Sequence, residues 1–86
     1  MTESNEDNPE MKLVQQEIWN EVFRALDELS EKQRTAFIQN EIEGKTLQQI
    51  ADEQNENIKT IISRKNYAVK HLRNRLDSLY REITNN

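Results

Sequence analysis

Basic and hydroxyl side chains gather near the start of the last predicted helix, which begins at about Ile58 and meets no helix breaker before Thr84. They are Lys59, Thr60, Ser63, Arg64 and Tyr67. Arg and Lys can bind phosphates or guanine edges, and Thr and Ser can bind a phosphate or a base. We expect these five side chains on the face directed away from Ile58 and Ile61. The pattern predicts a DNA-contacting face, although a solvated basic face would carry the same residue types.

A second polar cluster lies around the start of the preceding short helix, which is predicted from Leu47 to about Gln54. It consists of Lys45, Thr46 and Gln48. Thr46 and Gln49 have the spacing of a capping box, which begins a helix. Because the free backbone N–H groups of a helix N-terminus attract anions, this cluster predicts a second contact, to a phosphate.

A short polar turn, Asn55-Glu56-Asn57, separates these two helices. Asn55 can adopt the left-handed conformation of a tight helix exit, and Asn57 can cap the next helix. Ile58 and Ile61 are expected to face the inner side of the short helix, which carries Leu47, Ile50 and Ala51 at helical spacing. Two helices joined in this way predict a helix-turn-helix, whose second helix enters the DNA major groove.

Two further helices are predicted upstream. The first begins at the Asn8 cap with Pro9 in its first turn and runs to about Leu29. Its broad apolar stripe includes Trp19 and Phe23, which we expect in the core or at its edge; a docking surface for another protein is the alternative.

The second of these helices begins at a capping box, Ser30 with Gln33, and is closed by Gly44. Its expected buried residues are Ala36, Phe37 and Ile42.

The predicted fold is therefore an all-α, four-helix domain over residues 9–86, with a helix-turn-helix, no wing and a long C-terminal recognition helix. Residues 1–8 are acidic and polar, and we expect them to be disordered. The second half of the last helix has a heptad-like seam of Val69, Leu72, Leu76, Leu79 and Ile83. This seam is expected to pack antiparallel on the first helix; a dimer or partner contact is the alternative.

Charge is divided unevenly along the chain. Residues 1–56 hold fourteen acidic and five basic side chains, whereas residues 57–86 hold two and seven. The net charge is −4. An acidic body with a basic last helix suits a module that a larger partner brings to DNA better than a tight non-specific binder.

Composition argues against catalysis, metals and membranes. The chain has no Cys and one Gly, which excludes thiolate metal sites and glycine-rich phosphate loops. Its single His, His71, is expected on the surface without a chemical role. We predict no enzyme activity, no cofactor and no metal site. Without an apolar run of about 18 residues, we expect no membrane span and a cytoplasmic location.

Taken together, the motifs resemble region 4 of bacterial RNA polymerase sigma factors, especially the extracytoplasmic-function (ECF) type. The matching segments are Leu29-Ser30-Glu31-Lys32-Gln33-Arg34, Phe37, Ile42-Glu43-Gly44, Thr46-Leu47-Gln48-Gln49-Ile50-Ala51, Thr60-Ile61-Ile62-Ser63-Arg64 and Leu72-Arg73. Their order and spacing, from about Leu26 to Leu76 without a gap, carry the resemblance.

The resemblance implies sequence-specific binding of double-stranded promoter DNA at the minus-35 element. It also implies contact with the flap of the polymerase β subunit and a surface that an anti-sigma factor can cover. The family's region 2 is missing here, so the chain is expected to be a fragment or a solitary region-4-like protein. A monomer is preferred over a homodimer.

Three departures from the family pattern bear on function. Ile62 stands where many members have lysine; it cannot hydrogen-bond a base but could pack on a thymine methyl. Lys65 replaces an inward leucine, so its stem must lie along the core or the helix must rotate. Gln54-Asn55-Glu56 replaces a turn with an apolar plug.

Two alternatives stay open. One is a protein-interaction module, binding an anti-sigma factor or polymerase, that kept the fold without the DNA contacts. The other is a standalone helix-turn-helix repressor that dimerises through its C-terminal helix.

Overall fold

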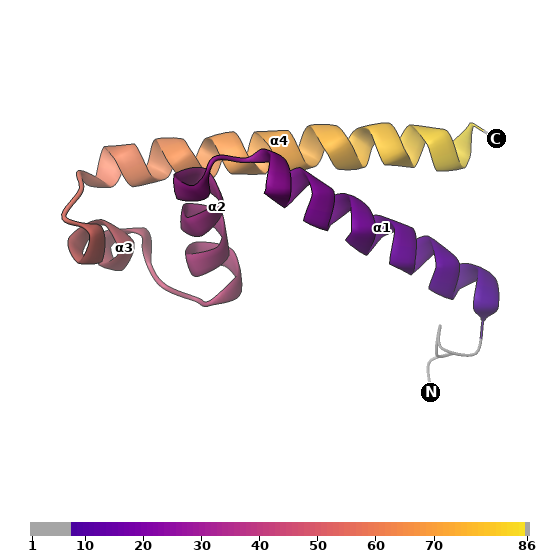
Figure 1. The fold of residues 1–86 in the computed structure, drawn as a ribbon, viewed down its shortest axis with the longest axis horizontal. Coiled ribbons are helices and arrows are strands. Elements are labelled where there is room, and N and C mark those ends of the chain that lie inside the picture. The colour runs from indigo at the N-terminus through magenta and orange to yellow at the C-terminus, as the bar shows by residue number, and fades with distance from the viewer. Residues whose placement is uncertain (1–7, 86) are drawn as a thin grey trace.

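The computed structural model of the chain describes residues 8–85. Its elements are α1 (Pro9–Glu28), α2 (Glu31–Phe37), the π-helical segment η2 (Ile38–Ile42), α3 (Leu47–Gln54) and α4 (Ile58–Thr84) (Figure 1). Strands are absent from the described residues, so the predicted all-α fold of four helices is confirmed. The segment 1–8, predicted to be disordered, lies outside the described residues except for Asn8.

Local capping explains where the helices begin. Asn8 Oδ1 accepts hydrogen bonds from the backbone N–H groups of Glu10 (3.0 Å) and Met11 (3.2 Å). The Ser30–Gln33 capping box forms in both directions, at 3.2 and 3.1 Å. Because each cap satisfies backbone donors that the first turn leaves free, all four predicted helix starts are confirmed.

The end of the second helix differs from the expectation. Past Phe37 the helix widens, and the Glu43 N–H donates to the Ile38 carbonyl five residues back (3.0 Å). Gly44 then takes a positive φ of 79°, the left-handed conformation expected of it. A π turn holds more residues than an α turn, so the side chains that follow it point to a different side of the helix than α-helical spacing predicts. Ile42, expected in the core, is 68% exposed.

Two small hydrophobic cores lie along α4. The first joins α2, α3 and the start of α4 through Ala36, Ile50, Ala51 and Ile61. The second joins α1 to the middle of α4 through Ala25, Leu26, Leu29, Ala68 and Leu72. The long last helix is therefore the element on which every other helix packs (Figure 1).

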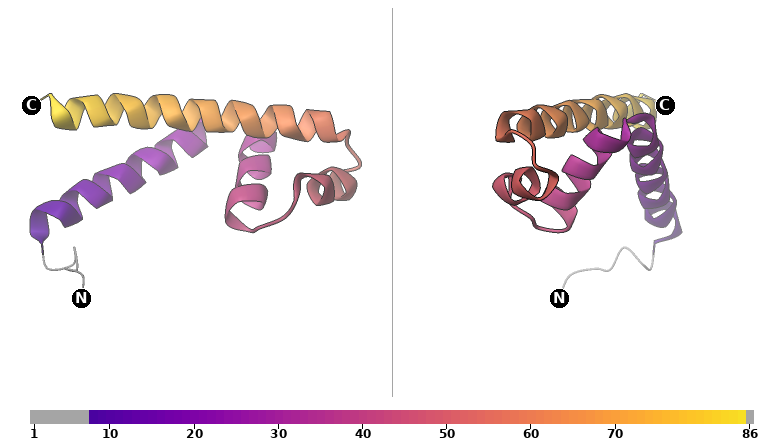
Figure 2. Two further views of the ribbon diagram at one scale, coloured as in Figure 1. Left: turned by 180° about the vertical axis from the view of Figure 1, so that it is seen from behind. Right: turned by 60° about the vertical axis from the view of Figure 1, so that its left-hand side comes forward.

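α1 and residues 69–84 of α4 form a splayed pair that we call the arm. The C-terminal end of α1 meets the middle of α4, and the two helices diverge toward the α1 N-terminus, as three views agree (Figures 1 and 2). Leu72 and Leu79 are buried, but Ile83 is 40% exposed. The expected antiparallel packing is thus limited to part of the seam.

The two aromatic residues of α1 lie outside the core. Trp19 is 59% and Phe23 is 58% exposed, and their rings lie 6.2 Å apart between centroids. The expectation that they lie in the core or at its edge is wrong, because Glu21, Val22 and Ala25 form the side of α1 that faces α4, and the two aromatic rings are turned away from it.

Charged groups hold the junction of the arm. Arg75 binds Glu21 (Nη2 to Oε2, 2.6 Å) and Glu28, and His71 Nε2 lies 2.7 Å from Glu28 Oε1. His71, expected on the surface, is therefore half-buried between helices. The hydrogen bonds from Arg75 and His71 lower the pKa of the Glu28 carboxyl. Hydrogen bonds to Glu28 and Glu21 raise the pKa of Arg75.

Within residues 8–85, none of the helices combines the length and apolar character needed to cross a membrane.

Candidate nucleic-acid interface

The α3–turn–α4 unit is built by local hydrogen bonds. The Gln49 N–H donates to Thr46 Oγ1 (3.0 Å), and the Thr46 N–H donates to Gln49 Oε1 (2.8 Å). Asn55 ends α3 in the left-handed conformation (φ 54°, ψ 46°), as predicted. Asn57 Oδ1 then accepts from the Lys59 N–H (2.7 Å) and starts α4. The three-residue turn, Asn55-Glu56-Asn57, therefore sets the direction of α4 relative to α3.

Packing fixes the rotation of α4. Ile50 of α3 and Ile61 of α4 are the largest fully buried side chains and share one core. Leu47 and Ile58 pack against its edge. Because Ile61 points inward, residues half a turn away from it must face solvent.

The exposed face of α4 is one continuous stripe. It consists of Lys59, Ile62, Ser63, Asn66, Tyr67 and Lys70. The spacing from Lys59 is three, four, seven, eight and eleven residues, which places all six on one side of a helix. Of the predicted contacts, Lys59, Ser63 and Tyr67 are therefore brought together, and Thr60 lies half-buried at the margin.

Two members of this stripe, Asn66 and Lys70, were not among the predicted contacts. They lie seven and eleven residues after Lys59, and this helical spacing could have predicted that they share its face. Asn can bind an adenine edge and Lys a phosphate, so both have the chemistry that a groove-facing helix needs.

Arg64 does not point outward as expected. Its side chain is only 18% exposed, and its Nη2 lies 3.2 Å from Glu56 Oε2 in the turn. A residue five positions after Lys59 lies well round the helix from it, toward the core and the turn. Arg64 thus ties α4 to the turn, and Lys59, Ser63 and Arg64 do not project as one group.

The predicted cluster at the start of α3 is also held by its own helix. Lys45 Nζ lies 2.8 Å from Glu53 Oε1, and this hydrogen bond raises the pKa of the Lys45 ammonium. Gln48 Nε2 donates to Asp52 Oδ1 (2.9 Å). Thr46 uses its hydroxyl for the cap described above. A phosphate at this position would have to compete with two carboxylates for Lys45 and Gln48.

Lys65 takes the inward path that its position requires. Its side chain is 19% exposed and its Nζ lies 2.6 Å from Glu41 Oε2 of η2. The apolar stem lies along the core while the ammonium reaches a carboxylate, so the helix keeps its rotation.

The electrostatics of the unit follow from these pairs. Lys45, Arg64 and Lys65 are each bound to a carboxylate, whereas the structure shows no ion pair for Lys59 or Lys70 within residues 8–85. In α3, the turn and the first half of α4, the positive charge available to a phosphate is therefore that of Lys59 and Lys70 on the exposed stripe. Across the same residues no group of three or more His, Asp or Glu side chains could hold a metal ion.

An all-α domain in which a short helix, a three-residue turn and a long helix share a buried core is a helix-turn-helix protein. Comparison with protein families makes the class specific: the sigma-70 region 4 model matches residues 19–72, well over half of the chain. The chain belongs to the sigma-70 region 4 family, as its motifs predicted. No curated protein and no solved structure gives a match.

Region 4 domains bind promoter DNA and RNA polymerase in general, and the family is one of DNA-binding transcription domains rather than of enzymes. The exposed stripe lies on the helix that a helix-turn-helix places in the major groove.

Proposed function

We propose that this chain binds the minus-35 element of bacterial promoters in a sequence-specific way through the exposed stripe of α4. The observation that carries the proposal is that Lys59, Ser63, Asn66 and Lys70 face solvent together, directly opposite the buried Ile61. Lysines supply contacts to phosphates, and Ser63 and Asn66 supply groups that can read base edges.

The paired cations shape the strength of this binding. With Lys45 and Arg64 bound to Glu53 and Glu56, fewer counterions are released when a duplex binds, so we expect weak affinity for the isolated chain. The resemblance to the ECF type supplies the partner that would compensate, the flap of the polymerase β subunit, in the bacterial cytoplasm. An anti-sigma factor is proposed as the competing partner.

The predicted contacts of Thr60, Arg64, Lys45, Thr46 and Gln48 remain proposals. Arg64 would reach DNA only after leaving Glu56, and Lys45 only after leaving Glu53. Their carboxylate partners therefore set an order: the stripe binds first, and these side chains add contacts in the complex.

Fluorescence anisotropy with promoter-like duplexes tests the proposal. We expect affinity to fall steeply with salt, and Lys59→Ala to reduce the slope of log K against log salt by about 1, the loss of one phosphate contact. Lys12→Ala, which removes an exposed lysine of α1, is the matched control and should leave the slope unchanged.

The rival function is a protein-interaction module without DNA binding. The observations that favour it are the carboxylate partners of Lys45, Arg64 and Lys65, and Ile62 at 36% exposure within the stripe. Affinity that is absent, independent of salt, or equally changed by both lysine variants would favour this module and count against promoter binding.

A further inference from the structure

The exposed stripe of α4 contains one aliphatic side chain, Ile62, which is 36% exposed. It is the fifth residue of α4 and directly follows Ile61, the fully buried residue that fixes the rotation of this helix. The rotation that buries Ile61 therefore also determines where Ile62 points. The proposed DNA contacts come from polar members of the stripe, and Ile62 has no part in them.

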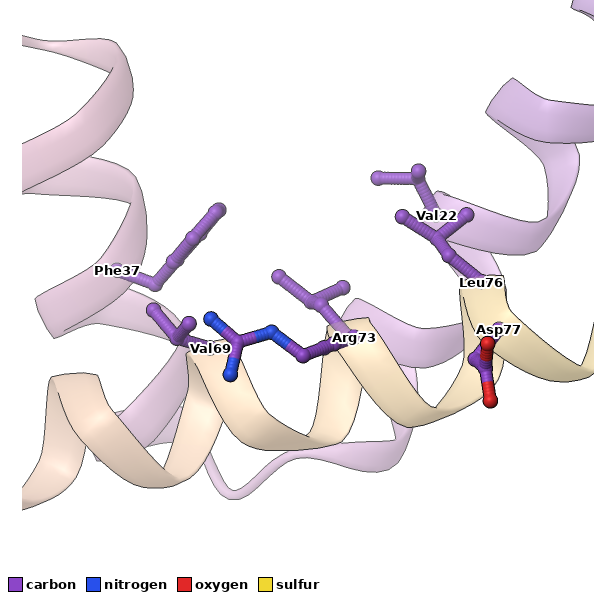
Figure 3. Close-up of a pocket in the computed structure, with 7 residues that line it drawn as sticks. Val22, Phe37, Val69, Arg73, Leu76 and Asp77 are labelled. Atoms are coloured by element: carbon purple, nitrogen blue, oxygen red, sulfur yellow. The ribbon is translucent and has the colours of Figure 1, made fainter.

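The apolar surface of the second half of α4 does not extend to Ile62. Two turns further along, Val69 lines an apolar hollow of about 560 Å³ with Phe37 of α2 (Figure 3). A second apolar hollow, of about 270 Å³, lies further along the arm. Ile62 lines neither hollow, and its helical neighbours in the direction of Val69 are Lys65 and Asn66. Ile62 is thus an isolated apolar side chain within a polar surface, and it suits a single small apolar group better than an apolar protein surface.

The position of Ile62 is one from which a recognition helix reaches bases. In helix-turn-helix proteins the N-terminal residues of the second helix contact base edges in the major groove. Ile62 lies in the second turn of α4, between Lys59 one turn before it and Asn66 one turn after it. Of the four bases, thymine alone presents an apolar group in the major groove, its C5-methyl.

We infer that Ile62 reads the C5-methyl group of a thymine and so sets part of the sequence specificity of this chain. The inference rests on the proposed function, because it requires α4 to lie in the major groove. Contact between the two aliphatic groups removes apolar surface of both from water, a gain that no other base offers. A β-branched side chain in a helix already holds one preferred rotamer, so little conformational freedom is lost when the contact forms.

Asn66 gives the position of this thymine within the bound sequence. The Asn side chain can make two hydrogen bonds to an adenine edge. Residues four apart advance about 6 Å along a helix, which is nearly two base-pair steps of about 3.4 Å each. With α4 lying along the groove, the thymine bound by Ile62 is therefore within about two base pairs of an adenine bound by Asn66.

Duplexes with and without the thymine methyl group test the inference. The full chain first selects its preferred sequence from a pool of random duplexes at low salt. Each thymine of that sequence is then replaced in turn by deoxyuridine, which lacks only the methyl group, and affinity is measured by fluorescence anisotropy. At the position bound by Ile62 we expect affinity to fall about fourfold, the effect of taking one methyl group out of an apolar contact.

Variants of the stripe assign this difference to Ile62. Ile62→Ala should bind the thymine and the deoxyuridine duplexes with equal affinity, whereas Ile62→Val, which keeps the branched methyl groups, should retain most of the difference. The matched control is Lys59→Ala, which should weaken binding to both duplexes to the same degree, because a phosphate contact does not depend on the base. Circular dichroism should show equal helix content for all three variants.

The outcomes separate this inference from promoter binding itself. A wild-type chain that selects a sequence but binds it equally well with thymine or deoxyuridine at every position overturns the role of Ile62 and leaves promoter binding in place. An Ile62→Ala variant that keeps the difference has the same meaning. A chain that selects no sequence from the pool overturns both.

Discussion

The helix-turn-helix and the arm are built from the same long helix by different means. In the helix-turn-helix, α3 and the first half of α4 enclose Ile50 and Ile61 together with Ala36 of α2, and the starts of α3 and α4 are capped by Thr46 and Asn57. In the arm, α1 leaves α4 after one junction and exposes Trp19 and Phe23. The first region has a filled inner face, whereas the second has an apolar face that no part of residues 8–85 covers.

The contrast suggests different roles for the two regions: the helix-turn-helix holds a helix in a fixed orientation, and the arm offers an apolar surface. A helix-turn-helix must hold its reading helix at one rotation, so its inner face is filled and its outer face is polar. Large contiguous apolar patches are rare on the surface of monomeric proteins, and those that occur are often contact sites. α4 therefore serves two surfaces, a polar one in its first half and an apolar one in its second.

The largest expected effect is a loss of folding stability when the core of the helix-turn-helix is disrupted. Ile61→Ala should lower the free energy of unfolding by about 2–5 kcal/mol, because it removes buried groups and leaves a cavity. A small domain has only about 5–15 kcal/mol in total, so much of the fold would be lost. Urea denaturation followed by circular dichroism measures the change.

Ile62→Ala is the control for that prediction, since the next residue is 36% exposed. Its effect should stay within about 0.5 kcal/mol. Equal losses for the two variants would mean that α4 is rotated from the position described, and the exposed stripe would have to be redefined.

A smaller effect tests the turn that sets the angle between α3 and α4. Asn55 has a φ of 54°, a conformation that a β-branched residue adopts only with strain. Asn55→Val should cost about 1–2 kcal/mol, whereas Asn55→Gly should be nearly neutral. Thermal unfolding of the two variants gives the comparison, and a stable Asn55→Val protein would contradict the left-handed turn.

The smallest effect concerns the charged side of the arm. The pKa of Glu28 is lowered in the folded state by Arg75 and His71, so its stabilising contribution is present above pH 4.5 and is lost as the pH falls through that lowered pKa. Wild-type protein should thus be more stable than Glu28→Gln at neutral pH, and the difference should vanish in acid.

Melting temperatures measured across this pH range check the prediction. Glu17→Gln, which changes an exposed glutamate of α1 that forms no ion pair within residues 8–85, should show no such convergence. A difference between wild type and Glu28→Gln that persists at the acid end would show that the carboxylate does not hold the junction.

Sequence patterns located the helix-turn-helix well because its determinants are close neighbours. The caps formed by Thr46 with Gln49 and by Asn57, and the helix exit at Asn55, each act within one turn of helix. The helical spacing of the apolar residues placed Ile50 and Ile61 inside. The same patterns misplaced Ile42, because nothing local signalled the π turn before it. They also placed Arg64 outward, since its partner Glu56 is eight residues away and across a turn.

The chain's amino acids by themselves determined the four helices, their caps, the left-handed exit at Asn55 and the membership in the sigma-70 region 4 family. The packing of the helices decided which cations are bound by carboxylates, that Asn66 and Lys70 complete the exposed stripe, and that Trp19 and Phe23 are exposed. The physical reason is range: caps and apolar spacing act over three or four residues, whereas the divergence of α1 from α4 depends on how whole helices pack.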